Sequence, residues 1–196
     1  MPQPCITAMT IHHFRNILSA QLKTAPVNII SGDNGSGKSS LLEALYYLSH
    51  LKSFRTSKPQ RLIHHDHDHF ILNSTISSDN DTHNIGLQRT SSHEQILKLN
   101  GETTKAQDIA YHLPMQFIDT QCHQYFTGGP EKRRQYLNWG LFHMKQSFLS
   151  TWKACTNLLR QRNAALKLRQ LSELDCWDHQ WTPLCESIHE MRRNYV

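Results

Sequence analysis

One eight-residue stretch, Gly32 to Ser39, constrains this chain more than any other. It reads Gly-Asp-Asn-Gly-Ser-Gly-Lys-Ser and fits the phosphate-binding P-loop pattern G-x-x-x-x-G-K-[ST]. A β-rich run at 27–30 precedes it, and leucines recur at helical spacing over 41–48. The sequence therefore predicts a strand, a phosphate-binding turn and a helix in immediate succession.

The chemistry of this pattern indicates ATP and Mg²⁺ as ligands. Glycines tolerate the positive φ angles of a tight turn, so backbone N–H groups can converge on a phosphate, helped by the dipole of the following helix. We expect Lys38 to reach the β- and γ-phosphates and the Ser39 hydroxyl to bind Mg²⁺. The predicted ATP-binding residues are Gly32, Asp33, Asn34, Gly35, Ser36, Gly37, Lys38 and Ser39.

Composition argues against a membrane-spanning or disulfide-rich protein. The 196 residues contain no apolar run near the ~20 that a membrane helix needs. The five cysteines are an odd, scattered set without a C-x-x-C pair, which argues against a zinc ribbon or a disulfide framework. The N-terminus lacks the features of a signal peptide, so we expect a cytoplasmic protein. The net charge of +5 permits a polyanionic partner.

Patterning around the P-loop predicts a hairpin, a β-meander and a helical region. A hairpin before a P-loop favours an ABC-type ATPase head over a plain kinase. Because the last helix has no C-cap signal, we expect the natural fold to continue beyond Val196. The predicted strands are 6–14, 17–23, 27–30, 70–77, 84–90, 95–99 and 113–118. Helices are predicted at about 36–51, 103–112 and 146–171, with others starting at Pro130 and at 181–183.

Basic side chains on predicted loops and helices suggest contacts with nucleic acid. A solvated surface explains them equally well, since Arg and Lys are common there. The sequence has no motif for reading bases, so phosphate contacts should dominate if DNA is bound. The candidate DNA contacts are Arg55, Lys58, Arg61, Arg133, Arg134 and Arg160.

The run His64-His65-Asp66-His67-Asp68-His69 has the composition of a metal-binding tract. In extended backbone, however, adjacent side chains point to opposite sides, and the sequence shows no distant partner for them. The favoured interpretation is a polar loop that picks up Ni²⁺ or Zn²⁺ adventitiously, and a functional metal site is the alternative.

The chain resembles the RecF family of recombinational-repair ATPases in the SMC/ABC superfamily. The resemblance implies an α/β fold: an ABC-type head at 1–121, whose mixed sheet includes an antiparallel meander, then an incomplete helical arm lobe at 122–196. Gln121 falls at the family's Q-loop position. The matching segments, in family order, are 11–16, 32–39, 42–48, 53–55, 128–130, 133–134, Leu137, 139–140, 142–143 and 161–167.

The same resemblance implies a role in DNA replication, recombination, the SOS response and repair. Family members are expected to form ATP-dependent homodimers, to bind double-stranded DNA near single-strand gaps, and to work with RecR and RecO in loading RecA. Three positions depart from the family pattern. Asp33 stands where Pro is usual, Ser39 replaces Thr but keeps the hydroxyl, and Asn138 replaces an Asp, so that a structural carboxylate contact would be lost.

Two motifs that hydrolysis requires are not evident in the sequence. There is no L-S-x-G-Q signature, and the one Walker B candidate, Asp119, follows an apolar run broken by Gln116 and is not followed by Glu. We therefore expect this chain alone to bind nucleotide weakly and not to turn over ATP. Two alternatives stay open: a non-catalytic DNA-binding remnant, and a small P-loop kinase that uses Asp119 for Mg²⁺. The hairpin and the meander oppose the kinase.

Overall fold

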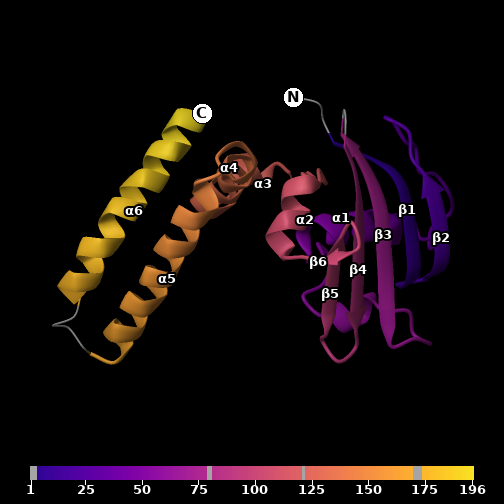
Figure 1. Cartoon of the computed structure of the whole chain (residues 1–196), viewed down its shortest axis with the longest axis horizontal. Helices are drawn as coiled ribbons and strands as arrows, with labels where there is room; N and C mark the ends of the chain where they lie inside the picture. Colours follow the sequence, from indigo (N-terminus) through magenta and orange to yellow (C-terminus); the bar gives the residue numbers. More distant parts are fainter. Residues whose placement is uncertain (1–3, 79–80, 121, 170–173) are drawn as a thin grey trace. The chain divides into compact units, whose positions relative to one another are not determined.

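The computed structural model describes residues 4–78, 81–120, 122–169 and 174–196. The chain divides into two compact units, Met1–Phe117 and Ile118–Val196 (Figure 1). The first contains an antiparallel sheet of order β2-β1-β3-β4-β5-β6. Its strands are β1 (Cys5–Phe14), β2 (Ile17–Lys23), β3 (His69–Ser78), β4 (Asp81–Thr90), β5 (Gln95–Leu99) and β6 (Glu102–Thr103), and its helices are α1 (Lys38–His50), α2 (Ala106–His112) and the 3₁₀ turn η1 (Pro59–Leu62).

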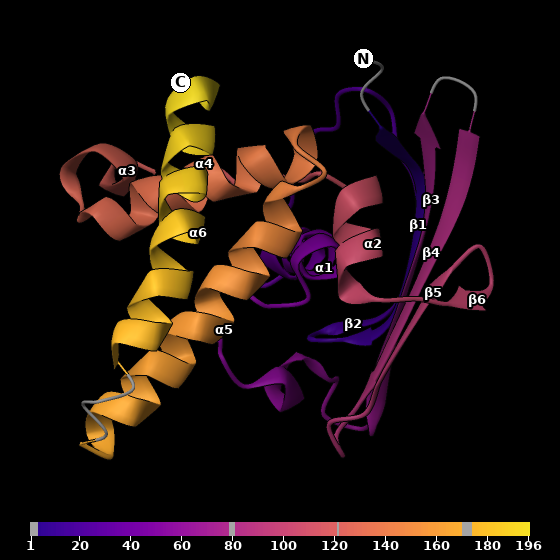
Figure 2. The ribbon, with the colours of Figure 1, turned by 60° about the vertical axis from the view of Figure 1, so that its left-hand side comes forward.

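Helices α1 and α2 lie on the same face of this sheet (Figure 2). Alternate residues of β3 are buried from Phe70 to Ile76, as expected for a strand with one covered face. The predicted hairpin and meander are therefore confirmed. The fully buried core residues are Met9, Ile11, Phe14, Ala44, Tyr47, Leu48, Leu62, Phe70, Leu72, Ile76, Ile85, Leu87 and Ile109.

Strand β1 changes phase near its end. Met9 and Ile11 are buried, so strict alternation would bury residue 13 next, but the buried residue is Phe14. His13 and Arg15 have φ angles of 57° and 56°, left-handed values that interrupt the pleat. This irregular turn leads into β2 and, as shown below, positions the P-loop.

Two predicted strands are absent from the structure. Residues 27–30, expected to lead into the P-loop, have no regular structure, and Val27 and Ile29 are 80% and 92% exposed. A strand needs a paired neighbour, and no described strand pairs with this segment, so the sheet of the described residues has no parallel part. The prediction of a strand at 113–118 is wrong for the same reason, since this segment is irregular.

The second unit is helical. It comprises α3 (Gln124–Thr127), α4 (Pro130–Met144), α5 (Phe148–Lys167) and α6 (Leu174–Tyr195). Helices α5 and α6 form the predicted antiparallel pair (Figure 1). No helix among the described residues has the length and apolar character needed to cross a membrane. The core of the unit consists of Leu141, Phe148, Cys155 and Ile188, with Phe142, Trp152, Trp181, Leu184, Cys185 and Met191 packed against it.

The last helix begins earlier than predicted. Helix α6 starts at Leu174, and Pro183, expected in the first turn, lies inside it. Proline removes one backbone hydrogen bond and crowds the preceding turn. The apolar side of α6, which includes Trp181, Leu184 and Ile188, packs in the core of the unit. This packing outweighs the local cost.

The thiols of Cys155 and Cys185 lie 3.6 Å apart between α5 and α6, and both are free. Burial, reinforced by the neighbouring Cys155 thiol, raises the pKa of Cys185 to about 11. A thiol with this pKa is neutral near pH 7 and therefore a poor nucleophile.

Candidate nucleotide-binding site

The P-loop has the backbone conformation that its glycines predict. Gly32, Gly35 and Gly37 have φ angles of 150°, 86° and 99°, values that residues with a side chain rarely adopt. Gly37 caps the N-terminus of α1, and the first turn of that helix has no acidic side chain. The Ser36 N–H donates to the Asp33 carbonyl at 3.2 Å and closes the turn. The loop and the helix N-terminus thus offer backbone donors to an anion.

The side chain of Lys38 folds back across this loop. Its Nζ donates to the carbonyl oxygens of Gly32 and Asp33 at 2.6 and 2.7 Å. Ser39 follows on the exposed side of the first helical turn. A cation over the loop, a hydroxyl next to it and a concave set of N–H donors fit a nucleotide phosphate and its magnesium ion.

Asn16, from the turn between β1 and β2, clamps the P-loop. Its Nδ2 donates to the Gly35 carbonyl at 3.0 Å, and its Oδ1 accepts from the Ser40 hydroxyl at 2.7 Å. A Cβ added at Gly37 would lie 3.3 Å from Asn16 Nδ2, so glycine is needed there for close packing as well as for its φ angle. One side chain therefore connects the loop, the helix start and the hairpin.

The neighbouring Arg15 anchors the helix itself. Its Nε and Nη2 donate to the Glu43 carboxylate at 2.9 and 2.8 Å, and its Nη1 donates to the Arg61 carbonyl at 2.8 Å. The Glu43 side chain is fully buried. Its carboxylate also accepts from the Ser53 hydroxyl and lies 3.6 Å from Arg55 Nη1. This bidentate, buried ion pair holds α1 against the segment that follows it.

The sequence alone assigns no role to Arg15, Asn16 or Glu43. Arg15 and Asn16 fall between the predicted strands 6–14 and 17–23, yet this turn contains neither the glycine nor the proline that turns favour. Polar residues in a turn without such residues can have a binding or anchoring role. A glutamate on a helix with a buried face is a second signal of an anchoring contact, because a buried carboxylate must be paired with a cation or a hydrogen-bond donor.

A cavity of about 590 Å³ lies beyond the C-terminal end of α1. Three cationic residues line it, Lys52, Arg55 and Arg89, and its eleven lining residues include no carboxylate. Arg89 reaches in from β4 and donates to the Tyr47 hydroxyl at 3.2 Å, while its buried Nε has no hydrogen-bond partner among the described residues. Burial raises the pKa of Tyr47, and Arg89 partly offsets this rise. The cavity thus presents positive charge to an anion, although Arg55 also lies 3.6 Å from the Glu43 carboxylate outside the lining.

The six predicted DNA contacts fall into different surroundings. In the first unit, Arg55 Nη1 lies 3.6 Å from the Glu43 carboxylate. Lys58 immediately precedes η1 and Arg61 lies within it, and both residues are exposed. In the second unit, Arg133 donates to the Gly128 carbonyl at 3.1 Å and so supports the end of α3. Arg134 and Arg160 are exposed on α4 and α5. Lys52 and Arg89, which the sequence analysis did not select, join Arg55 at the cavity.

Two further predicted residues contribute no site geometry. Gln121, the expected Q-loop residue, lies outside the described residues, so its role and the boundary between 121 and 122 stay predictions. Asp119 is exposed in an irregular segment. A Walker B carboxylate is expected at the end of a buried strand, and the surroundings of Asp119 give no support to the kinase alternative.

Comparison with known proteins gives consistent matches. The family model "RecF/RecN/SMC N terminal domain" matches residues 5–172. The "DNA replication and repair protein RecF" of Actinobacillus pleuropneumoniae serotype 5b is 42% identical over 194 residues, which cover 97% of this chain and 54% of that protein. The same-named protein of Pseudoalteromonas translucida is 38% identical over 196 residues.

Solved structures give the same fold. The structure of the recombination mediator protein RecF with ATP, in the RecFOR pathway, has a TM-score of 0.86 and 26% identity, covering 98% of this chain and 54% of that one. An SMC ATPase structure matches at a TM-score of 0.56 and 17% identity over 68% of this chain and 98% of that one, which bears on the fold alone. The predicted ATPase-head fold class is thereby confirmed. The chain spans about half the length of the curated relatives it matches, and it belongs to the RecF/RecN/SMC N-terminal domain family.

Proposed function

We propose that this chain is the nucleotide-binding part of a RecF-like DNA-repair ATPase. The observation that carries the proposal is the clamped P-loop. Three glycines with positive φ angles, Lys38 across the loop and Asn16 beneath it form a preorganised phosphate cradle within a RecF-like fold. Lys38 and the Ser39 hydroxyl are the side chains that would hold the phosphates of ATP and its Mg²⁺.

Binding to double-stranded DNA near single-strand gaps, and cooperation with RecR, RecO and RecA, belong to the same proposal. Family membership supports them, as does the cationic cavity of the first unit. ATP-dependent dimerisation is proposed on the same ground. The division into a head at 1–121 and an arm lobe at 122–196 is proposed on the same ground. We propose that hydrolysis requires a Walker B strand and a signature loop, neither of which is evident in this sequence.

The proposal is tested by ATP binding to the purified chain. We expect Mg-ATP to bind in an equilibrium fluorescence assay with a labelled nucleotide, and Lys38→Ala to weaken binding at least tenfold. Lys98→Ala is the matched control, since Lys98 is exposed on β5 of the same unit, and it should leave binding unchanged. Equal losses in both variants, or no binding by the unmodified chain at any accessible ATP concentration, would contradict the proposal.

A second candidate is a DNA-binding module that does not need nucleotide. The cavity lined by Lys52, Arg55 and Arg89 favours it, because three cations without a lining carboxylate suit a phosphate backbone. The discriminating measurement is DNA affinity against salt concentration, with and without Mg-ATP, on gapped and intact duplexes. A RecF-like ATPase should bind DNA better with ATP. A salt-dependent affinity that ATP and Lys38→Ala leave unchanged would favour the second candidate.

A further inference from the structure

The histidine-rich tract is held in place by the end of β1. The His64 N–H donates to the His13 carbonyl at 2.8 Å, and the Arg15 N–H donates to the Leu62 carbonyl at 2.7 Å. A β-bridge between Phe14 and Ile63 lies between these two bonds. The start of the tract is thus attached to β1 by backbone hydrogen bonds, so its first residues do not form a free loop.

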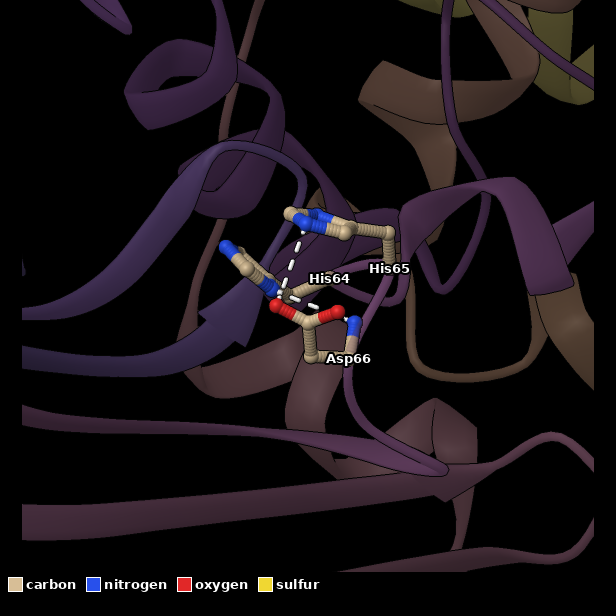
Figure 3. Close-up of side chains that lie close together, drawn as sticks. All are labelled: His64, His65 and Asp66. Atoms are coloured by element: carbon tan, nitrogen blue, oxygen red, sulfur yellow. Dashed lines mark hydrogen bonds and ion pairs between the residues drawn. The ribbon is translucent and has the colours of Figure 1, made fainter.

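The tract then turns instead of running straight. The His67 N–H donates to the His64 carbonyl at 3.0 Å, which closes a turn over His65 and Asp66. In an extended segment, adjacent side chains diverge. In this turn they converge: His64, His65 and Asp66 each offer a ligand atom, and these atoms lie within 4.8 Å of one another (Figure 3).

The structure also supplies the distant partner that the sequence did not reveal. The His13 ring, from the end of β1, stacks on His67 with ring centroids 3.5 Å apart. The His69 ring contacts His13 edge-on at 5.4 Å and pairs with Asp68 at 2.6 Å. These rings pack beside the turn and restrict it, while His64, His65 and Asp66 are left at its tip. The convergence of side chains in the turn therefore removes one reason for regarding the tract as a plain polar loop, namely the divergence of neighbouring side chains.

We propose that His64, His65 and Asp66 bind a divalent first-row transition-metal ion, with Zn²⁺ as the representative. Two imidazoles and a carboxylate are ligands for Zn²⁺, Ni²⁺ or Cu²⁺, whereas Mg²⁺ and Ca²⁺ require oxygen ligands. Around a tetrahedral zinc ion with bonds of about 2.0–2.2 Å, ligand atoms are roughly 3.3–3.5 Å apart. His65 Nε2 and Asp66 Oδ2 are already 3.1 Å apart.

Closing the site requires movements of the exposed His65 and Asp66 side chains around His64, which is half-buried and whose Nδ1 accepts from the Asp66 N–H at 3.5 Å. The side chains of His65 and Asp66 are 79% and 68% exposed, so they can approach the ion without disturbing the core. Three protein ligands leave a fourth position for water, as in exchangeable zinc sites. The proposal rests on the convergence of these ligands on a fixed turn, and it is independent of the proposed ATPase function.

The location gives the ion a structural consequence. The turn directly follows η1, whose Arg61 carbonyl accepts from Arg15, and Arg15 binds Glu43 on the P-loop helix. Pro59 and Leu62 of η1 also line the cationic cavity. Because an ion bound to the native turn alone shifts the folding equilibrium by mass action, we expect it to stabilise this segment against the sheet.

The test is Zn²⁺ binding by the untagged chain, measured by calorimetry and localised by amide NMR. We expect one Zn²⁺ per chain, chemical-shift changes confined to 13 and 62–69, and no such changes with Mg²⁺. His64→Ala/His65→Ala should weaken binding at least tenfold. The matched control is His179→Ala/His189→Ala, which removes two exposed histidines from α6 and should leave affinity unchanged.

Asp66→Asn keeps the size of the side chain, so it tests the site even if the double histidine variant fails to fold. It should also weaken Zn²⁺ binding while the far-UV circular dichroism spectrum stays unchanged. Equal losses in the site and control variants, or several weak ions spread over all histidines, would identify adventitious binding and overturn the proposal. Full affinity in Asp66→Asn would remove this residue from the ligand set and overturn the proposed site as well.

Discussion

At the scale of single residues, Asn16 allows the contribution of the P-loop's shape to ATP binding to be tested separately from the contribution of the Lys38 charge. Its amide binds the Gly35 carbonyl and the Ser40 hydroxyl. Asn16→Ala removes both bonds without altering Lys38. Neutral hydrogen bonds contribute about 1 kcal/mol each, so the loss of both should lower Mg-ATP affinity by up to roughly 30-fold, measured with the labelled-nucleotide assay. Asn28→Ala is the control, since the Asn28 amide binds only the backbone of Ala25 among the described residues; a similar loss there would contradict a specific clamp.

Asn138 is a second single-residue test. The family resemblance implies an aspartate here, and the structure shows that the Asn138 Oδ1 accepts from Arg192 Nε and Nη2 at 3.0 and 2.8 Å. The expected contact is therefore kept in neutral form. A carboxylate would make it charge-assisted, so Asn138→Asp should stabilise the second unit by about 1 kcal/mol.

The measurement is urea unfolding followed by tryptophan fluorescence, because all four tryptophans lie in the second unit. Asn138→Ala is the opposing control. It leaves the partly buried Arg192 unpaired and should lower the free energy of unfolding by about 1–3 kcal/mol. Destabilisation by Asn138→Asp would show that the site is built for a neutral acceptor.

At the scale of elements, local pattern was sufficient wherever an element finds its partner nearby in the chain. Strand β1 pairs with β2, and β3 pairs with β4, which in each case is the next strand in the chain. Both the hairpin and the meander were predicted correctly. Residues 27–30 have equal β character, yet Ile29 is 92% exposed and unpaired. A strand depends on its neighbour, which the local pattern does not contain. The clamp around the P-loop was missed for a related reason, because Asn16 and Gly35 meet only in the fold.

Helix α6 gives an element-scale prediction. In the structure Pro183 lies inside the helix, where proline costs about 3 kcal/mol relative to alanine. Pro183→Ala restores a backbone donor, so we expect the second unit to gain about 1–3 kcal/mol in urea unfolding, even after a small loss from a freer unfolded chain. If the helix instead began at 181–183, proline would suit its first turn. The same substitution would then be neutral or destabilising, which would contradict a continuous α6.

At the scale of the whole molecule, His143 makes the stability of the second unit sensitive to acid near neutral pH. Burial lowers the pKa of His143 below its usual 6.5, where its ring packs against Trp139 and Phe142 with centroids 4.8 Å from each. The unfolded state therefore binds a proton more readily than the native state. The stability of the second unit is fully present above pH 6.5 and falls as the pH drops from 6.5 toward the lower native pKa.

A second acid-sensitive group in this unit titrates in a separate range. The hydrogen bonds from Arg162 lower the pKa of Asp178 below its usual 3.8, so its contribution is lost only in more acidic solution. Urea unfolding followed by tryptophan fluorescence at pH 7.5, 6.5, 5.5 and 4.5 should show a decline that starts near 6.5. His143→Gln cannot gain the proton, so its profile should be flat from 7.5 to 4.5, while the exposed-site control His179→Gln keeps the decline. An unchanged decline in His143→Gln would assign the acid sensitivity to another group.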